Sequence, residues 1–130
     1  MKKLLTIFFL FGILFISHCS NKEKIEIVEI KDDQIEGQMI KAYREGIEAF
    51  EDRLYIEAAK KFNEAEILFP QSEWAPKSAL MAAYSYYSDD YNNRAISELK
   101  NFFKKYPNDP KTSYAHYLLA MSYYNKIVEE

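Results

Sequence analysis

Few side chains in this sequence are of the types that perform acid–base or metal chemistry. Of the two histidines, we expect His18 to be removed with an N-terminal signal, and His116 has no acid or nucleophile near it in the sequence. We interpret the acid pairs Asp32-Asp33 and Asp89-Asp90 as charges of a linker and a turn, not as metal ligands. No glycine-rich phosphate loop and no His-x-x-x-His pattern occurs. We therefore expect no enzyme, no cofactor and no metal site, and we expect the function to lie in binding.

The one cysteine, Cys19, follows an N-terminal segment with the pattern of a secretory signal. Residues 1–18 have two lysines near the start and then an unbroken apolar stretch, which is typical of a secretory signal. As a helix this stretch would span about 20 Å, short of the roughly 30 Å hydrocarbon core, which argues against the alternative of an uncut membrane anchor. A single cysteine also excludes a disulfide within the chain and a zinc site built from cysteines.

The tetrapeptide Ile16-Ser17-His18-Cys19 resembles the lipobox of bacterial lipoproteins, although His18 departs from the small residue usual at that place. The resemblance implies cleavage before Cys19 and lipidation of this residue with acyl chains such as palmitate. Two or more acyl chains hold a protein stably on a membrane. Ser20 in place of Asp implies transfer to the periplasmic face of the outer membrane. The alternative is a chance cysteine at the end of an ordinary signal.

Composition and charge restrict the classes of function. The chain has 130 residues, 48% of them hydrophobic, with only three Gly and four Pro, which fits one globular domain. Without Lys2 and Lys3, 15 basic residues face 20 acidic ones, so we expect no nucleic-acid partner. Residues 19–37 are charged, and we interpret them as a lipidated tether. Their alternating Ile25, Ile27 and Ile30 leave open a segment that pairs with a partner's sheet edge.

A repeat with a period of 37 residues organises the part from residue 38 to residue 130. Small residues, an aromatic residue and a proline stand at positions 8, 20, 24, 27 and 32 counted from Met39; these are Gly46, Ala58, Phe62, Ala65 and Pro70. The same positions counted from Pro76 hold Ala83, Ala95, Leu99, Phe102 and Pro107. This pattern resembles the tetratricopeptide repeat, in which small residues let two paired helices approach and a proline follows the second. The alternative is an unrelated stack of helical hairpins.

The resemblance predicts an all-α tetratricopeptide solenoid of about two and a half helix pairs, with repeats at about 39–72 and 76–109 and a last helix from about 113. The expected helices are Gln38–Glu51, Leu54–Leu68, Pro76–Ser88, Asn92–Tyr106 and Ser113–Val128. Leu118, Leu119 and Met121 on the last helix are expected to need a further helix to cover them. Either that helix acts as a cap, or the chain is the front portion of a longer protein.

In tetratricopeptide repeats, positions 2, 5, 9 and 12 of the first helix of each pair line a concave groove. This register gives Ile40, Tyr43, Ile47 and Phe50, then Lys77, Leu80, Tyr84 and Tyr87, then Tyr114, Tyr117, Met121 and Tyr124. The aromatic members predict a peptide-binding groove, because a tyrosine ring offers contact area while its hydroxyl needs a polar partner; they are Tyr43, Phe50, Tyr84, Tyr87, Tyr114, Tyr117 and Tyr124. The alternative is that these rings are core. His116 falls at a packing position.

The order of lipidated cysteine, tether and repeats resembles the BamD family of outer-membrane protein assembly lipoproteins. The segments Ala82–Tyr87 and Asn101–Pro110, followed by Tyr114–Tyr117, carry the likeness. It implies a scaffold of the β-barrel assembly machinery that binds C-terminal signals of unfolded outer-membrane proteins. It also implies docking on the POTRA region of a BamA-like protein and contact with the other lipoproteins of the machinery. About five repeats are usual there, so the chain would hold the front half. The competing hypotheses are a secretin pilotin or cell-envelope coordinator and, less well supported, a lipid-anchored hydrolase.

Overall fold

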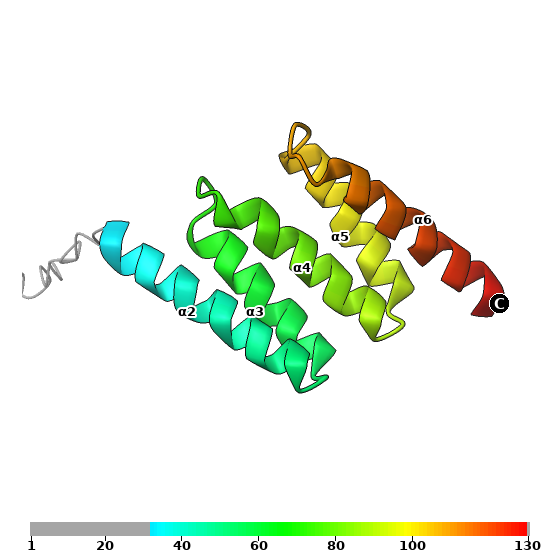
Figure 1. Cartoon of the computed structure of the whole chain (residues 1–130), viewed down its shortest axis with the longest axis horizontal. Helices are drawn as coiled ribbons and strands as arrows, with labels where there is room; N and C mark the ends of the chain where they lie inside the picture. The colour runs from blue at the N-terminus through cyan, green and yellow to red at the C-terminus, as the bar shows by residue number, and fades with distance from the viewer. Residues whose placement is uncertain (1–31, 130) are drawn as a thin grey trace, which may run out of the picture.

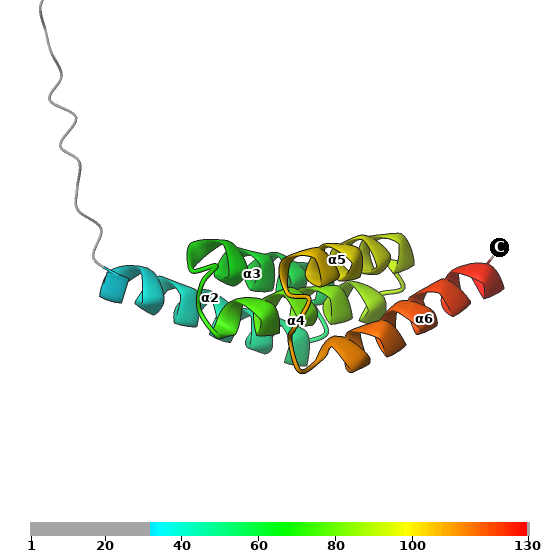
Figure 2. The ribbon, with the colours of Figure 1, turned by 90° about the horizontal axis from the view of Figure 1, so that it is seen from above.

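The computed structural model describes residues 32–129, and this part of the chain consists of helices and short connections without a strand. The helices are α2 (Asp32–Glu51), α3 (Tyr55–Leu68), α4 (Trp74–Ser88), α5 (Asn92–Lys105) and α6 (Thr112–Glu129). Successive helices run antiparallel and lie side by side, as Figure 1 shows. Seen from above, α2, α4 and α6 form one layer and α3 and α5 the other (Figure 2). The predicted all-α arrangement of two helix pairs and a last single helix is confirmed.

The predictions for residues 1–31, including the signal peptide, Cys19 and most of the tether, lie outside the described residues. Four of the five helices begin and end within two residues of the predicted bounds. Helix α2 is the exception, because it begins at Asp32 and not near Gln38, so it overlaps the predicted tether over residues 32–37.

The early start of α2 has a physical reason in its first turns. Ile35, Met39 and Ala42 continue one apolar stripe at helical spacing, and Met39 is fully buried. It packs in a cluster with Ala42 and Ala65, against residues from α3, α4 and the connection between them. Asp33 lies in the first turn, where a negative charge is favourable, and its carboxylate accepts a hydrogen bond from the Gln34 N–H at 3.0 Å. The repeat pattern begins at Met39, so it gives no prediction for residues 32–37 of this helix.

The two turns inside the helix pairs share one backbone conformation. Arg53 has a φ of 61° and Asp90 a φ of 58°, and these residues are equivalent in the 37-residue repeat. The next residue in each turn donates its N–H back to a carbonyl of the preceding helix, Leu54 to Ala49 at 2.8 Å and Tyr91 to Tyr86 at 2.9 Å. This left-handed residue followed by a reach-back bond is the Schellman helix ending. The repeat is therefore present in the backbone as well as in the sequence.

The contact between α2 and α3 depends on Gly46 and Phe62. Phe62 is fully buried, as are Ala58 and Ala65 on the same helix. A Cβ atom added to Gly46 would lie 2.8 Å from two carbons of the Phe62 ring, which is closer than such atoms approach in proteins. The phenyl ring therefore occupies the space that glycine leaves, as the repeat pattern predicts. In the second pair Ala83, Leu99 and Phe102 are buried at the equivalent places.

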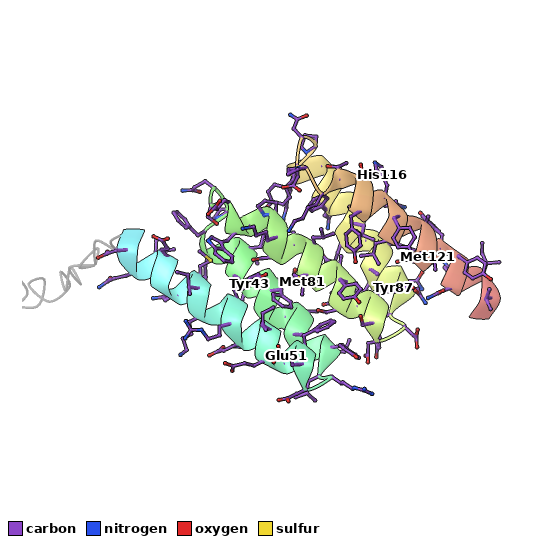
Figure 3. The ribbon with its side chains drawn as sticks, viewed as in Figure 1. Tyr43, Glu51, Met81, Tyr87, His116 and Met121 are labelled. Atoms are coloured by element: carbon purple, nitrogen blue, oxygen red, sulfur yellow. The ribbon has the colours of Figure 1, made fainter. Side chains whose placement is uncertain are left out.

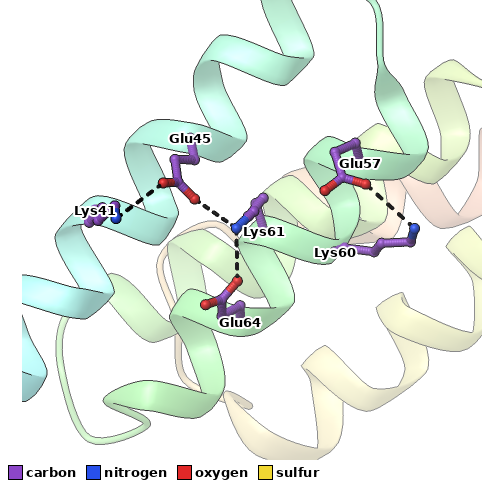
Figure 4. Close-up of polar contacts among 6 residues, drawn as sticks. All are labelled: Lys41, Glu45, Glu57, Lys60, Lys61 and Glu64. Carbon is purple, nitrogen blue, oxygen red and sulfur yellow. Dashed lines mark hydrogen bonds and ion pairs between the residues drawn. The ribbon is translucent and has the colours of Figure 1, made fainter.

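Ion pairs supplement this contact at the surface. Lys61 on α3 lies 2.7 Å from a Glu45 carboxylate oxygen on α2, and it also contacts Glu64 at 3.3 Å (Figure 4). Lys41 reaches the same Glu45 from one turn earlier, at 3.8 Å. The hydrogen bond from Lys61 lowers the pKa of Glu45. Because these side chains are partly exposed, the ion pairs contribute little to stability.

A buried carboxylate links α3 and α5, the two helices of one layer. Glu66 on α3 has a side-chain exposure of 8% and accepts hydrogen bonds from Lys105 and Tyr106, both at 2.8 Å. Burial and the bond to Glu66 raise the pKa of the Tyr106 hydroxyl, so it stays a donor at neutral pH. These hydrogen bonds join the end of α5 to α3, and so they connect consecutive repeats in the layer opposite α2, α4 and α6.

Candidate functional site

Helices α2, α4 and α6, the first helix of each repeat, share a hollow of about 440 Å³. We call it the tyrosine hollow. Its lining has three tyrosines and two lysines, together with Leu80 and Met81; they are Tyr43, Tyr84, Tyr114, Lys77 and Lys111. Figure 3 shows Tyr43 on α2 and Met81 on α4, which border it from two neighbouring repeats. Side chains that are far apart in the sequence therefore meet on one face of the stack.

A second hollow of about 230 Å³ lies beside the first and shares Tyr43 with it. We call it the isoleucine hollow, because Ile40 and Ile47 line it together with Trp74 and Arg44. Its polar surface is small, so it fits an aliphatic or aromatic side chain. The two hollows together are called the groove below. The isoleucine hollow lies at α2 and the start of α4, and the tyrosine hollow extends from α2 across α4 to the start of α6.

A row of aromatic rings runs beside the tyrosine hollow. Phe50 on α2 stacks on Tyr84 with ring centres 5.4 Å apart, and Tyr84 stacks on Tyr87 at 6.4 Å. Tyr43 makes edge contacts with Phe62 at 5.3 Å and with Trp74 at 5.1 Å. Burial raises the pKa of the Tyr43 hydroxyl. These four predicted groove residues, Tyr43, Phe50, Tyr84 and Tyr87, are half-buried, so each ring is covered in part by its neighbours and exposed in part.

The three predicted tyrosines of α6 are more exposed than those of α2 and α4. Tyr114 is 44% exposed and lines the tyrosine hollow, and its ring centre lies 6.4 Å from that of Tyr117. Burial, followed by the nearby Tyr84 hydroxyl, raises the pKa of Tyr114. Tyr117 and Tyr124 are about 60% exposed and line neither hollow. The structure thus brings Tyr43, Phe50, Tyr84, Tyr87 and Tyr114 together and leaves Tyr117 and Tyr124 at the edge.

Three side chains show what the register alone leaves undetermined. Leu80 borders the tyrosine hollow, as its register position predicts, but it is only 5% exposed and packs in the core with Leu99 and Phe102. Of the three residues expected to need a further helix, Leu118 is already covered by α5 and is 2% exposed, whereas Leu119 and Met121 are half-buried. His116 is an exposed residue whose ring stacks on Phe103 at 4.2 Å, which agrees with a packing position.

Four groove residues lie outside the positions that the repeat register indicates: Arg44, Trp74, Met81 and Lys111. Trp74 and Lys111 belong to the start of α4 and to the connection before α6, where the register gives no direction for a side chain. Their only signal in the sequence is chemical, since Trp74 is the single tryptophan and aromatic and basic residues are enriched in binding surfaces.

The residues that line the groove are better suited to binding a polypeptide than to catalysing a reaction. Its charged members are Arg44, Lys77 and Lys111, and no carboxylate borders either hollow. Within residues 32–129 no group of three or more His, Cys, Asp or Glu side chains is placed to hold a metal ion. Over the same span no helix is both long and apolar enough to cross a bilayer. The face offers aromatic contact area and positive charge.

Comparison with known proteins assigns the family. The family model described as YfiO, outer membrane lipoprotein, matches residues 35–130. An outer membrane protein assembly factor BamD of Caulobacter vibrioides is 30% identical over 114 residues, which is 88% of this chain and 36% of that protein. One of Neisseria meningitidis serogroup A is 31% identical over 115 residues, 87% of this chain and 42% of that protein. One of Rickettsia prowazekii is 34% identical over 82 residues.

The chain therefore spans about two fifths of the length of these relatives, or less. The match covers α3 to α6 and all of α2 except its first three residues, so it includes the three helices that build the groove. The repeat pattern, the paired helices and these matches agree, and the chain belongs to the YfiO family of outer membrane lipoproteins.

Proposed function

We propose that this chain is part of a lipid-anchored scaffold of the outer-membrane protein assembly machinery and that its groove binds unfolded outer-membrane proteins. The observation that carries the proposal is the row of half-buried aromatic rings beside the two hollows on the face of α2, α4 and α6. A segment of an unfolded β-barrel protein is extended and alternates in hydrophobicity, so it offers apolar side chains at regular spacing. The relatives named as assembly factors support this ligand over others.

The proposal includes the anchor and the partners that the resemblance implies. Acyl chains on Cys19 would hold the repeats on the periplasmic face of the outer membrane, in agreement with a family described as outer membrane lipoproteins. The POTRA region of a BamA-like protein and the other lipoproteins of the machinery would be its partners. We infer a binding function rather than catalysis, because the groove offers aromatic and basic groups without a paired acid or nucleophile.

The competing function is that of a secretin pilotin or another periplasmic coordinator, which would share the anchor and the repeats. The relatives that match carry the name of an assembly factor, which favours the first function. Purification of the lipidated chain from cells separates the two. We expect a BamA-like protein to be recovered with it, and recovery of a secretin instead would contradict the proposal.

Photo-crosslinking tests where clients bind. A benzoyl-phenylalanine at Tyr114, which lines the tyrosine hollow and is 44% exposed, should crosslink to newly secreted outer-membrane proteins. The matched control is the same side chain at Ile67, which is 74% exposed on α3 in the other layer. We expect crosslinks at Tyr114 and few at Ile67. Equal crosslinking yields at Tyr114 and Ile67, or crosslinks at Ile67 alone, would show that the groove is not the client-binding site.

A further inference from the structure

The isoleucine hollow is built on one stripe of α2, close to the point where the chain enters this helix. The lining residues on α2 are spaced by three and four positions, and Trp74 at the start of α4 completes the hollow. The stripe consists of Ile40, Tyr43, Arg44 and Ile47. Ile40 is 40% exposed although it is aliphatic. With a volume of about 230 Å³ and little polar surface, the hollow accepts one or two aliphatic side chains.

The segment just before α2 has the composition of a ligand for such a hollow. Residues 25–30 have the sequence Ile-Glu-Ile-Val-Glu-Ile, so four of these six side chains are aliphatic and β-branched. A tether that is only solvated needs no such residues, and a short apolar β-branched run left in water favours aggregation. An apolar surface of the same chain that covers this run removes the cost of exposing it to water.

The charges of this segment and of the groove are opposite. The acidic residues of the segment are Glu26 and Glu29. Arg44 borders the isoleucine hollow and Lys77 borders the adjoining tyrosine hollow, while no carboxylate lines either of them. Among residues 32–129 neither of these two cations takes part in an ion pair, and the Lys77 ammonium lies 4.4 Å from the centre of the Trp74 ring. The two glutamates therefore complement positive charge that the described helices do not neutralise.

The chain is long enough for the segment to reach the hollow. Ile40 lies eight residues after Asp32, the first residue of α2, which corresponds to about 12 Å along the helix axis. Residues 25–31 span up to about 23 Å when they are extended, so they reach Ile40 after a reversal of direction before α2. Because both parts belong to one chain, their effective concentration is on the order of millimolar, and a weak contact is enough to populate the bound state.

We infer that residues 25–30 fold back onto the isoleucine hollow and compete with a client for the groove. Their aliphatic side chains enter the hollow beside Trp74, and their two glutamates face the cations of the groove. The competition with a client rests on the proposed function, whereas the contact within the chain does not. A client that binds the groove releases the segment, and this lengthens the free part of the tether between Cys19 and the repeats.

Disulfide trapping in the lipidated chain tests the contact. The Ile27→Cys/Ile40→Cys variant pairs the segment with the hollow, and the acylated Cys19 thiol takes no part in the reaction. The matched control is Ile27→Cys/Lys41→Cys, which has nearly the same sequence separation, although Lys41 does not line the hollow and its side chain is 77% exposed. Under mild oxidation with copper phenanthroline we expect the disulfide to form roughly tenfold faster with Ile40→Cys. Equal rates in the two variants would overturn the inference.

The fluorescence of Trp74 gives an independent measurement, because it is the only tryptophan of the sequence and it lines the isoleucine hollow. In Ile25→Ser/Ile27→Ser/Ile30→Ser protein in lipid nanodiscs, the Trp74 emission should move to longer wavelength and acrylamide should quench it more strongly, because the ring loses apolar cover. The control Glu23→Ser/Lys24→Ser/Lys31→Ser changes three polar residues of the same tether and should keep the wild-type emission. Unchanged emission and quenching in the first variant would contradict the contact.

Client binding separates the inference from the proposed function. We expect the Ile25→Ser/Ile27→Ser/Ile30→Ser protein to bind an unfolded outer-membrane protein segment roughly tenfold more tightly than the wild type, because no competing segment has to be displaced. Equal affinity of the two proteins for this segment would overturn the competition. If neither protein binds the segment, the proposed function is wrong, and the disulfide rates still decide whether the contact within the chain exists.

Discussion

Replacing Phe62 with alanine should lower the free energy of unfolding by about 3–5 kcal/mol. Phe62 is fully buried between α2 and α3, and its ring makes an edge contact with Tyr43 at 5.3 Å. The surrounding backbones are held by helix pairing, so the space left by the ring collapses only in part. Urea unfolding followed by far-ultraviolet circular dichroism measures the change. Since domains of this size are stable by only about 5–15 kcal/mol, Phe62→Leu is the variant that keeps the measurement possible if Phe62→Ala fails to fold.

The same contact predicts a coupling between Phe62 and Gly46. A methyl group at Gly46 would meet the ring at 2.8 Å, so Gly46→Ala should destabilise the wild type by about 1–2 kcal/mol despite the better helix propensity of alanine. In the Phe62→Leu background this loss should shrink, because a smaller side chain frees the space. Gly37→Ala is the matched control on the same helix. No atom lies within 4 Å of its added Cβ, so it should gain up to about 1 kcal/mol. Equal losses of unfolding free energy for Gly46→Ala and Gly37→Ala would contradict the close contact between Gly46 and Phe62.

Truncating both Tyr84 and Tyr87 to alanine should weaken binding of an unfolded outer-membrane protein segment by roughly 100-fold, as expected when two central aromatic contacts are lost. Tyr84 lies at the middle of the ring row, between Phe50 and Tyr87, and it also borders the tyrosine hollow. Both rings are half-buried, so each still has exposed surface for a bound chain, and its removal takes away contact area that the rest of the groove does not replace. Calorimetry with a client segment measures the loss.

The design must separate binding from folding, because Tyr84 and Tyr87 also pack against the core cluster around Leu80 and Leu99. The Tyr84→Phe/Tyr87→Phe variant keeps the rings and their packing, and it should retain most of the affinity. Tyr91→Ala/Tyr123→Ala removes two exposed rings away from the hollows and should bind as the wild type does. A folded Tyr84→Ala/Tyr87→Ala protein with unchanged affinity would show that the ring row is not the client site.

The helix pairs could be predicted from the sequence because each repeat sets its own spacing through a few residues. Gly46 and Phe62 fix one close approach, and Pro70 and Pro107 follow the ends of α3 and α5. These effects are local, so the pattern of small, large and proline residues is enough to identify them. The extension of α2 over residues 32–37 could not be predicted from the repeat, because the repeat pattern begins only at Met39.

The groove could be predicted only in part, because the register gives a direction along the helix and not the depth of burial. Leu80 and Tyr117 occupy equivalent positions, yet the first is 5% exposed and the second 60%. Leu80 is covered by α5, and the described chain has no helix at the corresponding place beside α6. Lys111 and Trp74 enter the groove from the ends of helices, where the course of a connection decides the direction of the side chain.

The central claim is that a bound chain lies on the face of α2, α4 and α6. Nuclear Overhauser effects between an unlabelled client segment and the isotope-labelled lipoprotein in micelles test it most directly. We predict intermolecular contacts to ring protons of Tyr43, Tyr84 and Tyr114, which border one hollow. Contacts confined to exposed residues outside it, such as Ile67 on α3 or Val128 at the end of α6, with none to these three rings, would contradict the account.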